Sequence, residues 1–420
     1  MSEQTDLENL DLLTGHFHEG CKLNCIQKLG LEEEHFIVHD DTGHSVTYYE
    51  PGGVEEILGE LAGRFPRTET SEGHLIGCAN NDYAISLEPA AQLEISIAPR
   101  ESISCIMKIY RSFRAVTDEV LSKRGLHLVN IGYQPEDRVN DLPLIPKKRY
   151  EYMDRYFQLV DTRGRNMMRG TASTQISVDY CSEPDFVRKM RCAYLIMPAI
   201  RLLTDNAPVF EGKPSSGRLI RTRIWEHVDA DRCGIVPGLF DDSFGFESYA
   251  RYIWQVPVIF LPTPEGPVYT GRKRVCDLFA DSVMTKDDVE HVLSMVFPDV
   301  RLKHYVEIRG ADAMPEKYIA AYLALIKGIF FHSSATLAIL DEFRRVREAD
   351  LIEADHALMR DGFDANIYGV PADKFIDRLF VLARHGLDDG ELALLDPFRE
   401  LVRTKKTLAY SGFYDKRRTS

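Results

Sequence analysis

Two segments of this sequence place glutamates inside apolar patterns that are typical of buried strands. They are residues 29–38, LGLEEEHFIV, and residues 85–97, ISLEPAAQLEISI. Because a strand sends alternate side chains to opposite faces, Glu32 and Glu34 share one face, as do Gln92 and Glu94. Burying an unpaired carboxylate costs several kcal/mol, so this pattern favours a fold that brings cations to the strands, and carboxylate oxygens suit Mg²⁺ or Mn²⁺. The pattern is a first indication of a nucleotide-using enzyme.

A solvated strand face is the competing interpretation of these acids, because polar side chains on such a face need no ligand. Apolar residues surround the glutamates on both segments, and neither segment contains the Lys and Thr that an exposed face usually mixes in. Residue types alone leave both interpretations open. The candidate metal ligands on these segments are Glu32, Glu34, Glu88 and Glu94.

Two further pairs of residues could carry chemistry. Glu307 and Arg309 share a face of an expected strand at 301–310, where a metal-binding acid beside a phosphoryl-binding arginine would suit phosphoryl transfer. Taken alone, the pair is better explained by a cross-strand salt bridge or a solvated face. Arg221 and Trp225 are in phase on an expected strand at 221–225, so the arginine could clamp a substrate carboxylate while the indole walls the pocket. An exposed edge strand guarded by basic residues is the alternative.

The order of strands and helices predicts an α+β fold. Short connections between residues 74–79, 83–87 and 92–97 require antiparallel pairing, since parallel strands need long crossovers. The expected helices are residues 54–65, 102–123, 148–160 and 183–205, followed by an almost wholly helical stretch from 315 to 404. We therefore expect a polar leader at 1–26 and a single catalytic domain at 27–420, of which 315–420 is a mostly helical part packed on the rest.

Composition excludes several classes of function. The net charge of −14 disfavours binding to a nucleic-acid backbone. The eight cysteines show no CxxC spacing, which favours reduced thiols. The first twelve residues lack the features of a signal peptide, and no apolar run reaches the roughly 20 residues of a membrane span, so we expect a cytoplasmic protein with no membrane partner. Neither a P-loop nor a GxGxxG, HExxH or GxSxG motif is present.

Several motifs, taken together, resemble glutamate–cysteine ligase (γ-glutamylcysteine synthetase) of the plant and proteobacterial type. They follow the family's order with closely similar spacing from about residue 29 to residue 312. The longer ones are LGLEEEHF (29–36), SLEPAAQLEIS (86–96), MMRGTASTQISVDY (167–180) and RLKHYVEIRGAD (301–312). The shorter ones are EGKP (211–214), RTRIW (221–225), DR (231–232) and DSFGFE (242–247).

The resemblance implies a fold and a reaction. The fold is a curved antiparallel sheet, a funnel flanked by helices, like the catalytic domain of glutamine synthetase. In the reaction, the first step of glutathione synthesis, ATP phosphorylates the γ-carboxylate of L-glutamate. The amine of L-cysteine then attacks to give γ-glutamylcysteine, ADP and phosphate. The implied partners are these small molecules and Mg²⁺. Mn²⁺ is the alternative metal, and another amine is the alternative to cysteine. We expect a monomer or homodimer.

The resemblance also implies roles for individual residues. Arg309 would meet the transferring phosphoryl group, and Arg221 with Trp225 would hold glutamate. Gln92 and Arg169 are further candidates for substrate binding, although the family places an arginine directly before the threonine where this chain has Gly170. Tyr249 and Tyr252 resemble tyrosines of the acceptor pocket. The implied Mg²⁺ ligands are Glu32, Glu34, Glu88, Glu94 and Glu307. A non-catalytic relative that binds glutamate or nucleotide is the alternative function.

Overall fold

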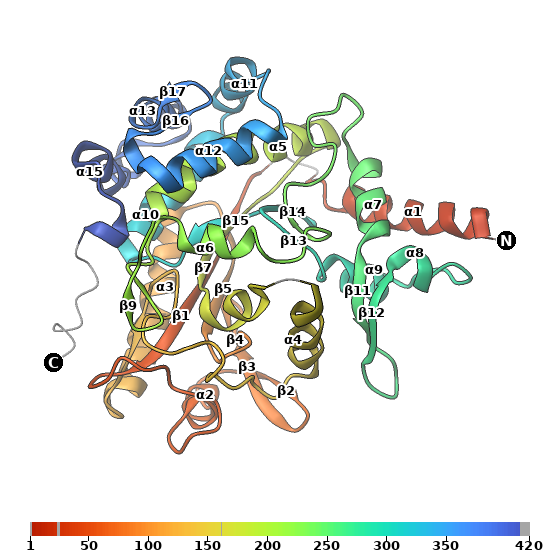
Figure 1. Ribbon diagram of the computed structural model, residues 1–420, viewed down its shortest axis with the longest axis vertical. Coiled ribbons are helices and arrows are strands. Elements are labelled where there is room, and N and C mark those ends of the chain that lie inside the picture. Colours follow the sequence, from red (N-terminus) through yellow and green to blue (C-terminus); the bar gives the residue numbers. More distant parts are fainter. Residues whose placement is uncertain (1, 23–25, 161, 412–420) are drawn as a thin grey trace.

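The centre of the fold is a nine-stranded antiparallel sheet (Figure 1). The computed structural model describes residues 2–22, 26–160 and 162–411. The strand order is β14-β15-β7-β1-β5-β4-β3-β2, and β6 also pairs with β1. The strands are β1 (Leu29–His39), β2 (Arg67–Ser71), β3 (His74–Ala79), β4 (Tyr83–Leu87), β5 (Leu93–Arg100), β6 (Leu126–Val129), β7 (Ser173–Val178), β14 (Val300–Leu302) and β15 (Val306–Asp312). The antiparallel pairing expected for β3, β4 and β5 is confirmed.

The register of β1 places its acids as the alternation predicted. Glu34 lies opposite Glu94 of β5, and Glu32 lies opposite Gln175 of β7. Glu33 and His35 point to the other face and are fully buried there. The Nδ1 of His35 bonds the carbonyl of Leu93 at 3.1 Å, which gives this histidine a structural role. One strand thus separates a site face from a core face.

Helices cover the core face of the sheet. The helices α3 (Ile103–Ser122), α5 (Glu183–Thr204) and α10 (Glu316–Phe330) pack against β5, β15 and β7. The N-terminus of α3 is capped, since the Ser102 hydroxyl accepts from the amide of Cys105. The remaining C-terminal helices gather at one side of the sheet, in blue in Figure 1. They are α11 (Ser333–Glu342), α12 (Glu348–Asp361), α13 (Ala372–Ala383), α14 (Asp389–Ala393) and α15 (Asp396–Thr404). The α+β class with a helical C-terminal part is therefore confirmed.

Smaller elements complete the fold around the sheet. The helices are α2 (Val54–Ala62), α4 (Lys148–Val160), α6 (Ile220–Trp225), α7 (Phe246–Gln255), α8 (Val275–Leu278) and α9 (Lys286–Leu293). The short strand pairs are β8 (Val209–Phe210) with β9 (Lys213–Pro214), β10 (Cys233–Gly234) with β13 (Phe297–Pro298), β11 (Pro257–Leu261) with β12 (Val268–Arg274), and β16 (Asn366–Ile367) with β17 (Val370–Pro371).

The N-terminal segment forms a helix where a polar leader was expected. Helix α1 (Ser2–Glu19) packs against α7 and α9 and lies beside them in Figure 1. Leu13 and Phe17, one helical turn apart, are fully buried. The sequence reading missed this stripe because acids and histidines separate its few apolar residues. The division into a leader and one catalytic domain stays a prediction.

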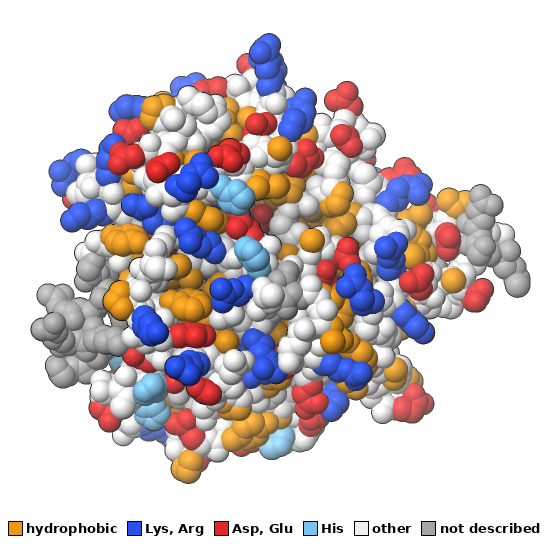
Figure 2. Space-filling model, viewed as in Figure 1, with side chains coloured by type: hydrophobic (Ala, Val, Ile, Leu, Met, Phe, Trp, Pro, Cys, Tyr) orange, Lys and Arg blue, Asp and Glu red, His pale blue; other side chains and the backbone are white. Residues whose placement is uncertain are grey.

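The remaining expectations from composition concern the cysteines, membrane spans and charge. The seven cysteines in the described part of the chain are free, and Cys25 lies outside the described residues. No single described helix is long and apolar enough to cross a membrane. The α10–α11 pair, bent by 81°, reaches that length and composition only when joined. On the face shown in Figure 2, acidic and basic side chains are mixed.

Candidate active site

A cavity of about 340 Å³ opens on the site face of the sheet. Its two kinds of charged side chain come from different elements. The acids lie on or next to the neighbouring strands β1, β4 and β5, whereas the cations come from the sheet's other half, from α6 and from the start of α4. The acidic wall is Glu32, Glu34, Glu88 and Glu94, and the basic wall is Lys147, Arg149, Arg221, Arg301, Lys303 and Arg309.

The acidic wall carries more negative charge than its surroundings offset. Among the residues that the structure describes, none of its four carboxylates forms an ion pair within 4.0 Å. Glu34 accepts hydrogen bonds from the amide (2.8 Å) and hydroxyl (2.9 Å) of Ser173, and Glu94 accepts one from the Ser86 hydroxyl (2.7 Å). Hydroxyl and amide donors stabilise a carboxylate but do not cancel its charge.

Burial raises the pKa of all four acids, and their mutual repulsion raises it further for three. The pKa of Glu32 rises to about 7 through burial and the charge of Glu94. That of Glu88 rises to about 7 through burial and the charge of Glu34, and that of Glu94 to about 8 through burial and the charge of Glu88. The pKa of Glu34 is also raised, by burial. A divalent cation bound here would relieve this repulsion.

The metal-free protein is expected to lose stability as pH rises from about 5 to about 8. The pKa of these carboxylates rises from its ordinary value of 4.5 to 7 or 8 in the folded protein. Their protonated forms therefore contribute stability that is fully present below pH 4.5 and is lost as the pH rises through the folded pKa values. Melting curves in chelator across this range measure the effect, and added Mg²⁺ should raise Tm more at pH 8 than at pH 6. A Tm that is level across the range, with no Mg²⁺ effect, would contradict it.

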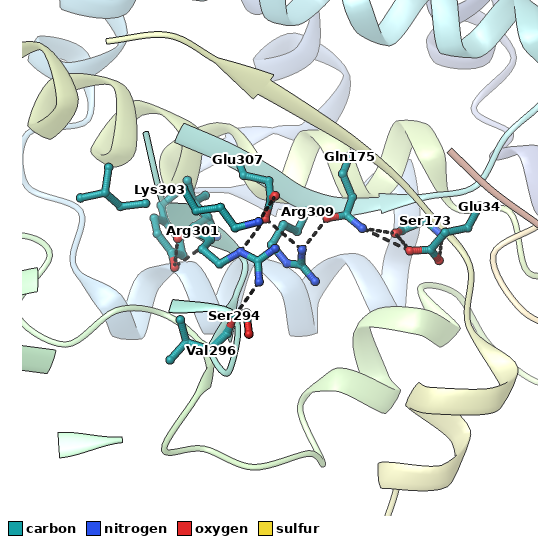
Figure 3. Close-up of polar contacts among 12 residues, drawn as sticks. Glu34, Ser173, Gln175, Ser294, Val296, Arg301, Lys303, Glu307 and Arg309 are labelled. Carbon is teal, nitrogen blue, oxygen red and sulfur yellow. Dashed lines mark hydrogen bonds and ion pairs between the residues drawn. The ribbon is translucent and has the colours of Figure 1, made fainter. Parts of the chain in front are cut away.

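Glu307 lies in a cluster of cations, and its charge also raises the pKa of the nearby Glu32. Its carboxylate accepts from the Nε of Arg301 at 2.7 Å and the Nη1 of Arg309 at 2.9 Å, and the Nζ of Lys303 lies at 3.5 Å (Figure 3). Glu307 is fully buried, and these cations, Arg301 first, hold its pKa well below the usual range. The structure therefore places Glu307 as the carboxylate that positions three cations, and does not bring it into the acidic wall as expected of a metal ligand.

Gln175 connects the two walls. Its Nε2 donates to Glu34 Oε1 at 3.2 Å, and its Oε1 accepts from the Nη1 of Arg309 (Figure 3). Arg309 lies in β15 at a register shift between Ile308 and Ala311, which re-aims its side chain toward the cavity. The arginine thus faces the acids across a single amide.

Arg221 and Trp225 share a face, but on a helix. The expected strand at 221–225 is wrong, because these residues form α6, and a spacing of four residues places both side chains together on it. The guanidinium carbon of Arg221 lies 5.5 Å from the centre of the Trp225 ring, and both line the cavity. The Nε of Arg221 and the Nε1 of Trp225 are buried without a hydrogen-bond partner in the described structure, so two donors are available to a ligand.

The other predicted binding residues divide between the cavity and the surrounding core. Gln92 lines the cavity, where its Oε1 accepts from the amide of Ala90 at 2.9 Å. Tyr249 is fully buried elsewhere, and its hydroxyl accepts from the amide of Leu302 at 3.1 Å. Tyr249 and Tyr252 are absent from the cavity lining, and Arg169 is absent too. The structure does not bring these three residues to the site.

A π-helical turn explains the position of Arg169. Residues Asn166–Gly170 form a π-helix, which accommodates one residue more than an α-turn, and β7 begins only at Ser173. The guanidinium of Arg169 consequently points into the core, where it donates to Asp154 Oδ1 and to the carbonyl of Leu142, both at 2.7 Å. A π-turn has no sequence pattern of its own, so the direction of this side chain could not be predicted from sequence.

Gly170→Ala is expected to destabilise the protein by about 1–3 kcal/mol. A Cβ at this position would lie 2.6 Å from the ring of Tyr133, which is fully buried and stacked on Phe210. Gly59→Ala in α2 is the matched control, since nothing lies within 4 Å of its Cβ and alanine favours a helix interior. Urea unfolding should move the two midpoints in opposite directions, and an unchanged midpoint for Gly170→Ala would contradict the packing.

Sequence reasoning missed several residues of the cavity. Arg301 and Lys303 could have been found from sequence. They are two residues apart on the expected strand at 301–310, in phase with Glu307 and Arg309. Lys147 and Arg149 carry no such signal, since they sit where a loop enters α4. Arg149 is held in place by Ser294, whose carbonyl accepts from it at 2.9 Å.

A cavity with carboxylates facing arginines suits phosphoryl transfer, and comparison with known proteins specifies the family. The sequence model of glutamate–cysteine ligase family 2 matches residues 28–404. This chain belongs to that family. The chloroplastic glutamate–cysteine ligase of Arabidopsis thaliana is 32% identical over 415 residues, covering 94% of this chain and 78% of the plant protein. That of Nicotiana tabacum is 33% identical over 416 residues, with the same coverage.

A solved structure resembles this member of glutamate–cysteine ligase family 2 in fold. It is the glutamate–cysteine ligase of Francisella tularensis in complex with AMP, with a TM-score of 0.57 over 95% of this chain and 87% of that chain. The two sequences are 12% identical, so the likeness concerns the fold.

The relatives also correct the expected localisation. Those from Arabidopsis, Brassica juncea, Medicago truncatula and Nicotiana are chloroplastic enzymes, so the prediction of a cytoplasmic family member is wrong. The inference failed because an N-terminus without a secretory signal excludes only the secretory route. Reduced thiols and a net charge of −14 do not distinguish the remaining compartments.

Proposed function

We propose that this chain uses ATP to join the γ-carboxylate of L-glutamate to the amine of L-cysteine through γ-glutamyl phosphate. The observation that carries the proposal is the single cavity in which four unpaired carboxylates face Arg221, Arg309 and further cations. Phosphoryl transfer from a nucleotide to a carboxylate brings two anions together, so it needs cations on both. Membership of the family supports the choice of substrates.

The acidic wall supports a Mg²⁺ site. Its hard oxygen donors, which form no direct ion pair in the described structure, fit the coordination that Mg²⁺ prefers, and burial together with mutual repulsion raises the pKa of Glu32 and Glu94. Mg²⁺ bound there would offset the charge of the ATP phosphates. The residues that would hold it are Glu32, Glu34, Glu88 and Glu94.

The cation cluster around Glu307 supports a role in stabilising the transferring phosphoryl group. Arg309 reaches the cavity while Glu307 and Gln175 both accept hydrogen bonds from its Nη1 and so hold its guanidinium in place. A guanidinium positioned before the reaction loses little free energy in reorganising when charge develops on the phosphoryl oxygens. Arg309 is thus the proposed catalytic residue, and Glu307 positions it.

Arg221 and Trp225 support a site for the amino acid. A guanidinium with an unpaired Nε can donate two hydrogen bonds to one carboxylate, and the indole beside it supplies a wall and a further donor. Placed between the acidic wall and Arg309, such a site would hold glutamate with its side chain toward the phosphoryl donor.

Arg221→Lys is expected to raise KM for glutamate at least about tenfold while KM for ATP changes little, since a lysine keeps the charge but loses the paired hydrogen bonds. Arg223→Lys on the same helix is the matched control, because Arg223 is exposed. Initial rates at varied glutamate and varied ATP separate the two constants. An equal rise in both would assign Arg221 to general folding of the site.

The proposed reaction is tested by phosphate release from ATP with Mg²⁺. Release should require glutamate and cysteine together, and mass spectrometry should detect γ-glutamylcysteine. Phosphate release that requires glutamate and another amine would identify that amine, instead of cysteine, as the acceptor. Calorimetric ATP binding without turnover on any amine of a panel would favour a non-catalytic relative and overturn the proposal.

A further inference from the structure

Outside the active site, two histidines and a glutamate converge from three elements. His16 lies in the last turn of α1, Glu290 lies in α9, and His304 lies in the turn between β14 and β15. One potential ligand atom from each residue lies within 4.8 Å of the other two. The His16 Nδ1 is 3.8 Å from Glu290 Oε1, and the two imidazole rings are stacked with their centres 4.0 Å apart.

Packing holds the two histidines close together. The side chain of His16 is only 11% exposed. The end of α1 approaches the turn so closely that a Cβ on Gly20 would lie 2.8 Å from the Cα of His304. The Nε2 of His304 is buried and has no hydrogen-bond partner among the described residues, an arrangement that costs free energy unless a ligand completes it.

We propose that His16, Glu290 and His304 bind a divalent transition-metal ion of the zinc class. Imidazole nitrogen and a carboxylate suit Zn²⁺, whereas Mg²⁺ prefers oxygen ligands alone. Tetrahedral ligands at about 2.0–2.2 Å from Zn²⁺ stand about 3.4 Å apart, so the cluster needs to contract by less than about 1.5 Å. The two stacked imidazole rings must turn so that one nitrogen of each is aimed at a common ion. Glu290 can follow, because its side chain is 62% exposed, and water can take the fourth position.

Nearby lysines do not occupy the cluster. Lys286 pairs with Glu19 at 3.5 Å, and Lys22 pairs with Asp179 at 3.8 Å and donates to the carbonyl of His304 at 3.2 Å. The metal would tie α1 and α9 to the turn that also carries Lys303, a residue of the active-site cavity. Its expected effect is therefore to stabilise the attachment of α1.

The test is a calorimetric titration of the chelator-treated full chain with Zn²⁺ in excess Mg²⁺, which keeps the acidic wall occupied. One Zn²⁺ per chain is expected, together with a rise in Tm. His16→Ala, His304→Ala and Glu290→Gln should each weaken binding about tenfold or more. His18→Ala is the control, since His18 is exposed on the same helix. The exposed Glu290 lets its variant report on binding where a histidine variant fails to fold.

Co²⁺ as a second probe identifies the ligands by absorption. Nitrogen and oxygen ligands should give visible bands without the near-ultraviolet thiolate band, which would instead assign the metal to cysteines. Failure to bind one Zn²⁺ per chain, a thiolate band, or binding unchanged in all three variants would overturn the proposal. Each outcome is independent of whether the chain ligates glutamate to cysteine.

Discussion

Arg309→Ala is expected to lower kcat by about 10²–10³-fold with the fold intact, the loss typical of removing one donor that stabilises transition-state charge. The substitution leaves Glu307 bonded to Arg301 at 2.7 Å with Lys303 at 3.5 Å, so no buried carboxylate is stranded. Arg309→Lys should lose less, because it keeps the charge without the planar guanidinium. Phosphate release at saturating substrates measures the change.

Two comparisons make this result specific. Arg344→Ala is the control, since that side chain is 65% exposed in the helical C-terminal part and should leave kcat unchanged. Circular dichroism and Tm verify that each variant folds. A folded Arg309→Ala protein with wild-type turnover would remove Arg309 from the reaction.

Glu94→Gln is expected to weaken Mg²⁺ activation at least about tenfold and, without metal, to stabilise the protein at pH 8.5. Glu94 lies opposite Glu34 on the paired strand, and burial raises its pKa to about 8. Ionised Glu94 therefore opposes folding above that pH, whereas glutamine keeps the hydrogen bond from Ser86 without the charge. At pH 5 Glu94 is neutral in the folded protein, and the difference in Tm between the two proteins should be much smaller than at pH 8.5.

The comparison needs a glutamate on the same sheet but outside the site. Glu69→Gln on β2 provides it, because Glu69 is exposed, and neither its Mg²⁺ activation nor its stability should change. Rates at varied Mg²⁺ and melting curves in chelator at pH 5 and 8.5 measure both effects. A Glu94→Gln protein that is less stable than wild type at pH 8.5 would contradict a wall of excess negative charge.

The parts of the site on regular strands were predictable from sequence. Alternation along β1 separates Glu32 and Glu34 from Glu33, and the structure keeps this separation, with Glu33 on the core face held by Thr174 and the amide of Met314. The same rule places Arg309 beside Glu307. Such predictions hold because the side-chain period of a strand follows from its covalent geometry.

The remaining parts depend on contacts that no local pattern encodes. The spacing of Arg221 and Trp225 puts them on one face of either a strand or a helix. Packing in the folded protein stabilises the helix. The π-turn that removes Arg169 from the site depends on the close contact of Gly170 with Tyr133. Glu307 could not be recognised as a positioning residue without the cross-strand pairing that brings Arg301 opposite it.

The most direct test of the account follows oxygen from substrate to product. Glutamate carrying ¹⁸O in its γ-carboxylate is incubated with ATP, Mg²⁺ and cysteine, and the released phosphate is analysed by mass spectrometry. Attack of the γ-carboxylate on ATP predicts one ¹⁸O atom in each phosphate formed. Phosphate that contains no ¹⁸O, released while the dipeptide accumulates, would contradict a γ-glutamyl phosphate intermediate.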